Sequence, residues 1–301
     1  MAAAPWRAAR RVDRRRDGYP VLYAEAFAGE QQFFSSLVFG KDLVAAGGTT
    51  TETVLLHCPQ CTKESKKNKA VIIGGYSASP FMLMCRDKIT NLAELKGKKV
   101  RSSGGRVFLM KAAGAIPVAM SPAQATTALQ RGALDCVWGA PSWLRSYSYQ
   151  DVAKHIIDYP LGMVGPVLSM FINRGTWNKM IMAQKKAHFK YAPRVVAHSV
   201  ITAYLLRDEE VLKNAKQAGV TLQPGGKEFD ELVAARQKAQ RQQNLDSARK
   251  FGVKNPEAII VAFEKALVKW RGLSKGIGRD VVKYEAALKR EIYYKLDINK
   301  L

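Results

Sequence analysis

The organisation of this chain follows from residues 95–105, which read Leu95-Lys96-Gly97-Lys98-Lys99-Val100-Arg101-Ser102-Ser103-Gly104-Gly105. A glycine turn leads into a short strand that ends at Arg101, and a loop rich in serine and glycine follows. An arginine at a strand end presents a planar fork of N–H donors beside open backbone N–H groups, which suits a carboxylate. Arg101 is therefore a candidate anion-binding residue.

Strands and helices alternate on both sides of this stretch. We predict strands at residues 70–75, 81–85, 98–101, 117–120, 134–139, 168–173 and 219–222. We predict helices at 107–113, 121–131, 149–158, 227–250 and 279–297, another that starts at 255–257, and a long helical region from Trp177 to about Ala218 that is interrupted near Pro193. This alternation is typical of a parallel or mixed α/β sheet, whose ligands lie at the carboxyl ends of strands. Arg101 and the Trp138–Gly139 pair both occupy such ends, so we expect them to lie together.

The chain before residue 70 is harder to assign. Residues 1–18 are basic and irregular, and residues 19–39 are aromatic-rich and fit a helix or a loop. Gly47–Thr51 is expected to break regular structure, whereas residues 53–57 fit a helix or a strand. Residues 63–69 are polar and compatible with a helix.

Length and composition are those of a globular protein with one large domain or two lobes. The chain has 301 residues, of which 47% are hydrophobic and 24% charged, so global disorder is not expected. No apolar run approaches the roughly 18 residues that cross a bilayer. The arginine-rich opening lacks the apolar core of a secretory signal.

The charge balance is strongly basic, with 48 Lys and Arg against 25 Asp and Glu, a net charge of +23. It favours anionic partners such as organic acids, nucleic acid or an anionic membrane face, and the alternative is a solvated basic surface. Nucleic-acid binding would need basic residues gathered with aromatics on one face. The lysines are scattered instead, so we rank that reading low.

Four cysteines are present, at Cys58, Cys61, Cys85 and Cys136. Cys58 and Cys61 have the spacing of half a zinc site or of a redox pair. A zinc site needs four ligands, and no second close pair exists, with His57 the adjacent candidate. We favour a structural disulfide or plain thiols, and the pairing stays open.

The patterns of common enzymes are missing. The four histidines, at positions 57, 155, 188 and 198, are separated and form no metal-binding motif. The sequence has no G-x-S-x-G, no phosphate-binding loop and no dinucleotide-binding glycine pattern. Asp135 is better explained as a structural carboxylate than as a catalytic base. We therefore rank an enzyme below a binding protein, and we expect no metal or cofactor.

Five segments in order resemble motifs of the solute-binding receptors of TRAP transporters (DctP type, tripartite ATP-independent periplasmic). They are Leu95–Arg101, Gly114–Val118, Ala128–Asp135, Asp151–His155, and Ile172-Asn173 with Trp177; weaker similarity covers residues 70–270. The resemblance implies a two-lobe, periplasmic-binding-protein-like (type II) α/β fold with mixed sheets and a long helix crossing both lobes. It also implies a periplasmic protein that is not an enzyme.

By this resemblance, Arg101 forms a salt bridge with the carboxylate of a small organic acid held in the cleft. The lobes would close on the acid and deliver it to the large and small membrane subunits of the transporter. The family's polar pair after the strand is here Trp138-Gly139, and an aromatic wall suits an apolar or ring-bearing acid. Further lining is expected from Asn173, Phe171, Trp143 and Tyr76. The same fold could instead serve a ligand sensor.

The expected division is 1–18, a basic irregular N-terminus; 19–100 plus about 190–235, lobe 1; 101–189 plus about 236–255, lobe 2; and 256–301, C-terminal helices. Family members begin with an export signal, a strand, a helix and a further strand that have no counterpart here. We therefore expect an incomplete or shifted N-terminus, a first lobe without its first strand, and poor stability, because unpaired sheet edges are a liability.

Overall fold

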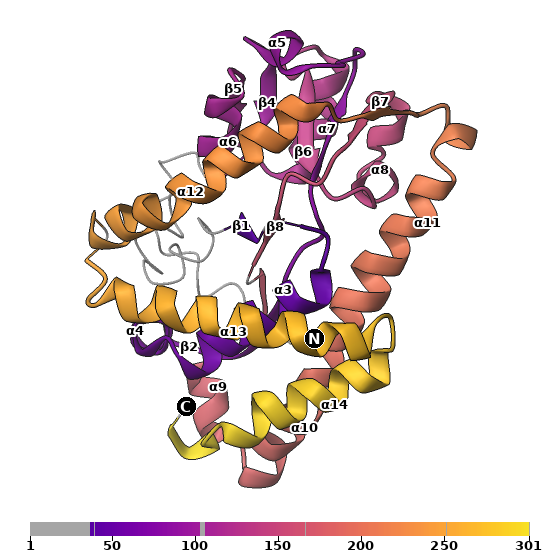
Figure 1. The fold of residues 1–301 in the computed structure, drawn as a ribbon. Helices are drawn as coiled ribbons and strands as arrows, with labels where there is room; N and C mark the ends of the chain where they lie inside the picture. The colour runs from indigo at the N-terminus through magenta and orange to yellow at the C-terminus, as the bar shows by residue number, and fades with distance from the viewer. Residues whose placement is uncertain (1–36, 39, 103–105, 166, 251, 301) are drawn as a thin grey trace.

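The computed structural model describes residues 37–38, 40–102, 106–165, 167–250 and 252–300. The predictions for the basic opening, for most of the aromatic-rich segment 19–39 and for the missing first strand concern residues outside these ranges. Ser103, Gly104 and Gly105 lie outside them too. The described chain forms an α/β fold with two lobes (Figure 1), as the sequence predicted.

A mixed six-stranded sheet forms the centre of one lobe, which we call the sheet lobe. The strand order is β10-β7-β3-β6-β4-β5. The bounds are β3 Met82–Cys85, β4 Lys99–Arg101, β5 Ile116–Val118, β6 Cys136–Gly139, β7 His155–Asp158 and β10 Thr221–Pro224. β4 runs parallel to β5 and β6, whereas β3 runs antiparallel to β6 and β7. The carboxyl ends of β4 and β6 therefore meet at one edge of the sheet.

Helices cover both faces of this sheet because its side chains alternate between two cores. Leu83 and Trp138 face a core that is covered by α6 (Arg106–Ala112) and α12 (Lys227–Lys250). Met84 and Val137 face a second core, covered by α7 (Pro122–Gln130), α8 (Trp143–Ser146) and α11 (Arg207–Lys213). The short helix α5 (Leu92–Leu95) precedes β4.

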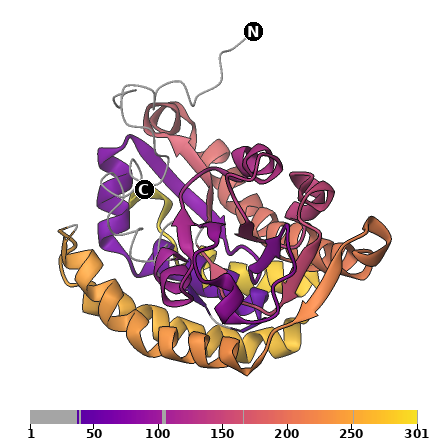
Figure 2. The same cartoon turned by 90° about the horizontal axis from the view of Figure 1, so that it is seen from above.

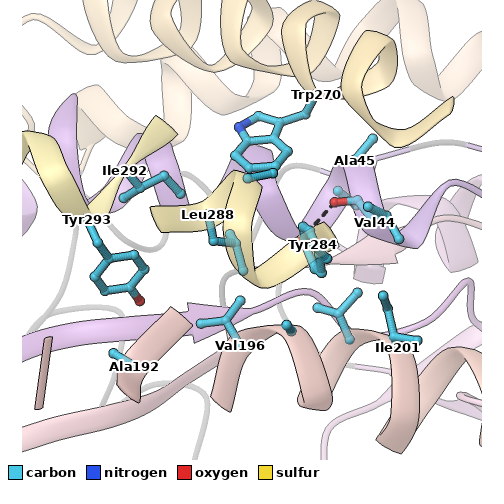
Figure 3. Packing of buried hydrophobic residues seen from close by; sticks show 14 of the residues in the cluster. Val44, Ala45, Ala192, Val196, Ile201, Trp270, Tyr284, Leu288, Ile292 and Tyr293 are labelled. Carbon is cyan, nitrogen blue, oxygen red and sulfur yellow. Dashed lines mark hydrogen bonds between the residues drawn. The ribbon is translucent and has the colours of Figure 1, made fainter. Parts of the chain in front are cut away.

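The other part, the helical lobe, packs helices around a two-stranded antiparallel sheet of β2 (Ala70–Tyr76) and β9 (Val167–Asn173). Its helices are α3 Leu43–Leu56, α4 Pro59–Lys67, α9 Arg174–Lys179, α10 Met182–His198, α13 Pro256–Ile277 and α14 Val281–Glu291. Trp270, Tyr284 and Val196 meet in its core (Figure 3). β1 (Leu37–Val38) pairs with β8 (Met163–Val164). Short helical turns complete the chain at Tyr149–Asp151 (η2), Lys216–Ala218 (η4), Tyr293–Lys295 (η5) and Ile298–Lys300 (η6).

A long helix joins the two lobes, as predicted. α10 continues through the π-helical segment η3 (Ser199–Leu206) into α11, and the run passes from the helical lobe to the sheet lobe (Figure 1). The predicted interruption near Pro193 is wrong, since Pro193 lies buried inside α10. The break falls earlier, between α9 and α10, and the winding changes later, at Ser199. α12 and α13 form a curved belt along the outside of the molecule (Figure 2).

Two local predictions are wrong for identifiable reasons. The helix predicted at 149–158 is a short turn, η2, followed by the strand β7, because Ile156 and Ile157 complete the ladder between β10 and β3. The predicted break at Gly47–Thr51 lies inside α3. A Cβ atom on Gly48 would lie within 2.6 Å of three Trp270 ring atoms, so glycine lets α13 approach α3 closely.

Local sequence signals account for several helix ends. Ser121 and Gln124 form the capping box that begins α7, and Asn91 and Asn255 cap α5 and α13. Gly114, which follows α6, has a positive φ of +77°, a conformation that favours glycine. The predicted bounds of α12 match the structure.

The sheets do not follow the predicted lobe boundaries. A boundary at residue 100 would fall inside β4 and would separate β3 from its hydrogen-bonded neighbours β6 and β7. We propose instead that residues 82–158 and about 207–235 build the sheet lobe, because their side chains supply its two cores.

The four cysteines form two disulfides, Cys58–Cys61 at the start of α4 and Cys85–Cys136 between β3 and β6. Both cysteines of the first pair are buried. The described residues contain no group of three or more His, Cys, Asp or Glu side chains that would hold a metal ion. In the same ranges, no helix combines the length and the apolar character needed to cross a membrane.

Candidate functional site

Arg101 ends β4 and is only 4% exposed. Its Nε–H donates a hydrogen bond to the Met120 carbonyl oxygen at 3.0 Å. Its Nη1 is also buried but has no hydrogen-bond partner among the described residues. Burial lowers the pKa of the guanidinium, because a cation loses hydration free energy in a low-dielectric surrounding. A buried donor without a partner costs free energy that an added acceptor would recover.

The Trp143 ring provides a surface for this guanidinium, with the Arg101 Cζ 5.4 Å from the ring centroid. Gly139 makes the position of the ring possible, since a Cβ there would lie 2.3 Å from the Trp143 Cε3. The ring therefore occupies the space next to β6 that a side chain at 139 would fill. A cation over an indole face is electrostatically favourable.

More aromatic rings extend this surface. Phe81 lies 5.1 Å from Trp143 between centroids, and Tyr147 meets the same indole edge-on at 5.6 Å. Tyr149 stacks on Tyr147, and its hydroxyl donates to the Pro122 carbonyl oxygen. The candidate site is thus a buried cation set among aromatic rings.

Arg106 brings a second guanidinium to the same ring cluster. It begins α6, and its Cζ lies 5.3 Å from the Phe81 ring centroid. Burial, and then the charge of Arg101, lower the pKa of Arg106. The two guanidiniums therefore repel each other.

Tyr204 connects this cluster to the helical lobe. Burial raises the pKa of its hydroxyl, and the neighbouring Tyr76 adds to that effect. The rings of Tyr76 and Tyr204 lie 5.6 Å apart. Tyr204 belongs to the π-helical segment η3, so the site spans β2, the long helix and α8.

Asp208, at the start of α11, fixes the turn that carries Trp143. Its Oδ1 accepts a hydrogen bond from the Ser142 backbone N–H at 2.7 Å. Burial raises the pKa of this carboxyl group, and hydrogen bonds from Ser142 oppose that effect. The long helix thus supports the ring beneath Arg101.

The structure brings some of the predicted site residues together. Arg101, Trp143, Gly139 and Tyr76 join through the contacts described above. Trp138 lies one layer deeper, fully buried in the core under α6 and α12, where it meets Phe81 edge-on at 6.3 Å.

Asn173 and Phe171 are not brought to this cluster. Asn173 pairs with Ala70, at the end of β2 opposite Tyr76, which is roughly 20 Å away along the strand. The Asn173 side chain caps α9 instead, accepting from the Thr176 N–H. Phe171 pairs with Ile72 and is 60% exposed.

Sequence reasoning missed Arg106, Phe81, Tyr147 and Tyr204. Arg106 carried a usable signal in the sequence, because a second arginine follows Arg101 after only four residues. Tyr204 carried none, since only the course of the long helix places it beside Trp143. A surface cavity of about 310 Å³ lies between α8 and α11, but Arg101 does not line it.

Comparison with solved structures shows the fold. A TRAP periplasmic solute-binding protein from Bordetella bronchiseptica, with bound (R)- and (S)-mandelate, is 20% identical with a TM-score of 0.66, covering 80% of this chain and 76% of that chain. One from Rhodoferax ferrireducens, in complex with copurified benzoate, is 14% identical with a TM-score of 0.67, covering 83% and 77%. The ectoine-binding protein of the TeaABC TRAP transporter of Halomonas elongata is 15% identical with a TM-score of 0.65, covering 82% and 79%.

Comparison at the level of sequence identifies the family. No curated protein matches the sequence. The profile of the family described as bacterial extracellular solute-binding protein, family 7 (DctP), matches residues 75–244. That match spans more than half of the chain and includes β3 to β10 together with the long helix. The chain therefore belongs to family 7 of the bacterial extracellular solute-binding proteins.

Proposed function

We propose that this protein binds a small organic acid between its lobes, with Arg101 receiving the carboxylate, and delivers it to the membrane subunits of a TRAP-type transporter. The family membership supports the role of receptor, and a receptor of this family acts outside the cytoplasm, in the periplasm. The observation that carries the proposal is the buried Arg101 guanidinium, whose Nη1 lacks a partner among the described residues.

A carboxylate matches what Arg101 offers. A guanidinium binds a carboxylate through parallel N–H donors, and such charge-assisted bonds are about twice as strong as neutral ones. The low-dielectric aromatic surroundings strengthen the attraction further. Because Arg101 is buried, the acid would enter when the lobes separate and would be enclosed when they close.

The rings around Arg101 favour an acid that carries a ring of its own. Trp143 and Phe81 offer flat apolar faces next to the guanidinium. Two of the similar solved structures hold mandelate and benzoate, which are acids of this kind. Aromatic pairs contribute about 0.5–1.5 kcal/mol beyond the area that they bury.

Calorimetric titration with benzoate and mandelate, and with benzamide and mandelamide as uncharged controls, tests the proposal. We expect the acids to bind and the amides to bind at least roughly tenfold more weakly, because a neutral amide gives up the charge-assisted pair. Equal affinity for an acid and its amide would show that Arg101 does not receive a carboxylate.

A further inference from the structure

We propose that the outward face of α10 holds this protein against the surface of an anionic phospholipid bilayer. That face, which we call the α10 face, consists of Lys186, Lys190, Tyr191, Arg194 and Val195, all of them exposed. It belongs to the helical lobe, and the inference does not depend on the ligand that Arg101 receives.

α10 divides its side chains between two sides. One side, which includes Phe189 and Val196, is buried in the core of the helical lobe. The three cations of the α10 face are spaced four residues apart, so they form one row along the exposed side. Its two apolar residues are also four apart and form the next row, with Tyr191 50% and Val195 45% exposed.

The charge around the α10 face has one sign. The sequence has no Asp or Glu between Asp158 and Asp208, a stretch that contains seven Lys and Arg. β2 and η3 pack against α10 and contain no acidic residue, whereas α14 carries three cations and two carboxylates. One of these, Glu285, is 8% exposed and pairs with Arg194 at 3.0 Å and with Lys289 at 2.6 Å. Positive charge therefore remains in excess.

The spacing of the cations does not favour the helix itself. Like charges four residues apart destabilise a helix, and the α10 face has two such pairs, Lys186 with Lys190 and Lys190 with Arg194. The Lys190 Nζ and the Arg194 Cζ both lie over the Tyr191 ring, 5.5 and 5.9 Å from its centroid. A densely anionic surface would offset this repulsion, which Glu285 relieves at Arg194 alone.

A lipid surface fits this composition better than an acidic protein does. Helices that lie in a membrane interface combine Lys and Arg with apolar and aromatic side chains, and tyrosine favours the level of the headgroups. Lysine is depleted from protein–protein interfaces, yet two of the three cations here are lysines. Figure 1 shows α10 at the end of the helical lobe opposite the sheet lobe, so contact there would leave the sheet lobe free to move.

The test is co-sedimentation of the full chain with vesicles of phosphatidylcholine and with vesicles that also contain phosphatidylglycerol. We expect binding to the anionic vesicles, little binding to the neutral ones, and weaker binding as the salt concentration rises. Lys186→Gln combined with Lys190→Gln should weaken binding about tenfold or more, since each cation near such a surface contributes a factor of about five. Tyr191→Ser keeps the charge and should weaken binding about threefold or more, because the ring no longer enters the headgroup region.

Lys238→Gln combined with Lys254→Gln is the matched control, because both lysines are exposed, lie outside α10 and give a variant of the same net charge. It should bind the anionic vesicles within about threefold of wild type. Equal losses in the two double variants would show that net charge alone attracts the protein to lipid, and would overturn the inference. Wild-type protein that does not bind the anionic vesicles would overturn it too. Soluble polyglutamate that binds more tightly than the vesicles, with the same dependence on Lys186 and Lys190, would assign the α10 face to an acidic protein instead.

Discussion

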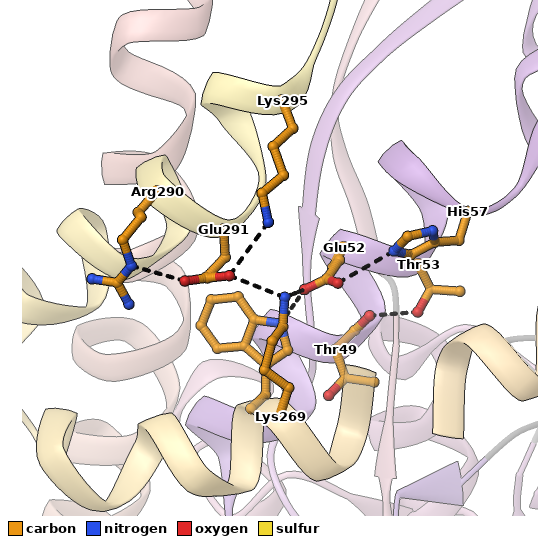
Figure 4. A network of polar contacts seen from close by, with 9 residues as sticks. Thr49, Glu52, Thr53, His57, Lys269, Arg290, Glu291 and Lys295 are labelled. Carbon is orange, nitrogen blue, oxygen red and sulfur yellow. Dashed lines mark hydrogen bonds and ion pairs between the residues drawn. The ribbon is translucent and has the colours of Figure 1, made fainter. Parts of the chain in front are cut away.

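Arg101 and Glu52 are both charged and almost fully buried, one in each lobe, but their surroundings differ. Glu52, in α3, accepts from the Trp270 indole N–H at 2.7 Å, pairs with the Lys269 ammonium at 2.7 Å and meets His57 at 3.3 Å (Figure 4). Arg101 has a carbonyl partner for its Nε and none for its Nη1 within the described chain.

This contrast distinguishes a buried charge that stabilises the fold from one that keeps a donor available for a ligand. Glu52 is bound by Trp270 and Lys269 of α13 and by His57, the residue that caps α3, so it holds α3 against α13 and has no free oxygen to offer a ligand. The charge of Arg101 is matched only in part, so it retains a donor for one. A buried polar group without a partner requires an explanation, and the binding role that we propose for Arg101 would supply one.

Glu52→Gln tests the structural side of this contrast and should have the largest effect. It leaves the Lys269 ammonium, one-third exposed, without its nearest carboxylate and should cost roughly 3 kcal/mol of stability. Urea denaturation measures the change. Glu231→Gln, in an exposed pair with Lys227, is the control and should cost less than about 0.5 kcal/mol. Equal losses of unfolding free energy in the two variants would show that Glu52 stabilises the fold no more than a surface carboxylate does.

Arg101→Met tests the functional side and should change binding without lowering stability. Affinity for benzoate or another bound acid should fall about 100-fold, because the charge-assisted pair is lost. The free energy of unfolding should stay the same or rise, because a buried donor without a partner is replaced by an apolar chain. A large loss of stability would mean that Arg101 is structural, as Glu52 is.

Glu291 makes the stability of the helical lobe depend on pH. Although burial alone would raise its pKa, hydrogen bonds from Arg290 and Lys269 lower it from 4.5 to about 2. A lowered folded-state pKa gives stability that is present above pH 4.5 and is lost as the pH falls toward 2, by roughly 2 kcal/mol. Unfolding curves of wild type and Glu291→Gln should therefore converge over this range. A constant difference would contradict the assignment.

Tyr204→Phe should have the smallest effect, because it removes one hydroxyl between the lobes. The buried hydroxyl loses its polar contacts with Trp143 and Tyr76, which should cost about 1 kcal/mol of stability, measured by thermal unfolding. The control is Tyr294→Phe, whose ring is 78% exposed and which should behave as wild type. If both variants behave alike, Tyr204 does not link the site to the helical lobe.

Local signals were enough to predict most of the sheet lobe. Caps such as Ser121, the positive φ of Gly114 and short β-branched runs act within a few residues, so they are legible in sequence. Gly47 and Gly48 were misread because their role depends on Val200, Tyr284 and Trp270, which are remote in the chain. The strand β7 was misread as a helix because its two neighbours, not its own residues, decide its conformation.

The residues of the candidate site likewise divide into those that local sequence predicts and those that long-range packing decides. Arg101, Gly139 and Trp143 were predicted from motifs that lie close together in sequence. Asn173 was placed in the site by its motif alone, and the register of β9 puts it at the far end of β2. Tyr204 could not have been predicted, because its position depends on how the π-helical segment orients the long helix.

The contact between Gly48 and Trp270 also sets an order of events during synthesis. Gly48 lies near the start of the described chain, and the ring that covers it lies more than two hundred residues later. The core of the helical lobe likewise joins Val44 to Tyr284 and Leu288. As the chain emerges from the ribosome, strands β3 to β7 can assemble before α13, the packing partner of α3, has been synthesised. The first helix of the described chain is thus among the last to be buried.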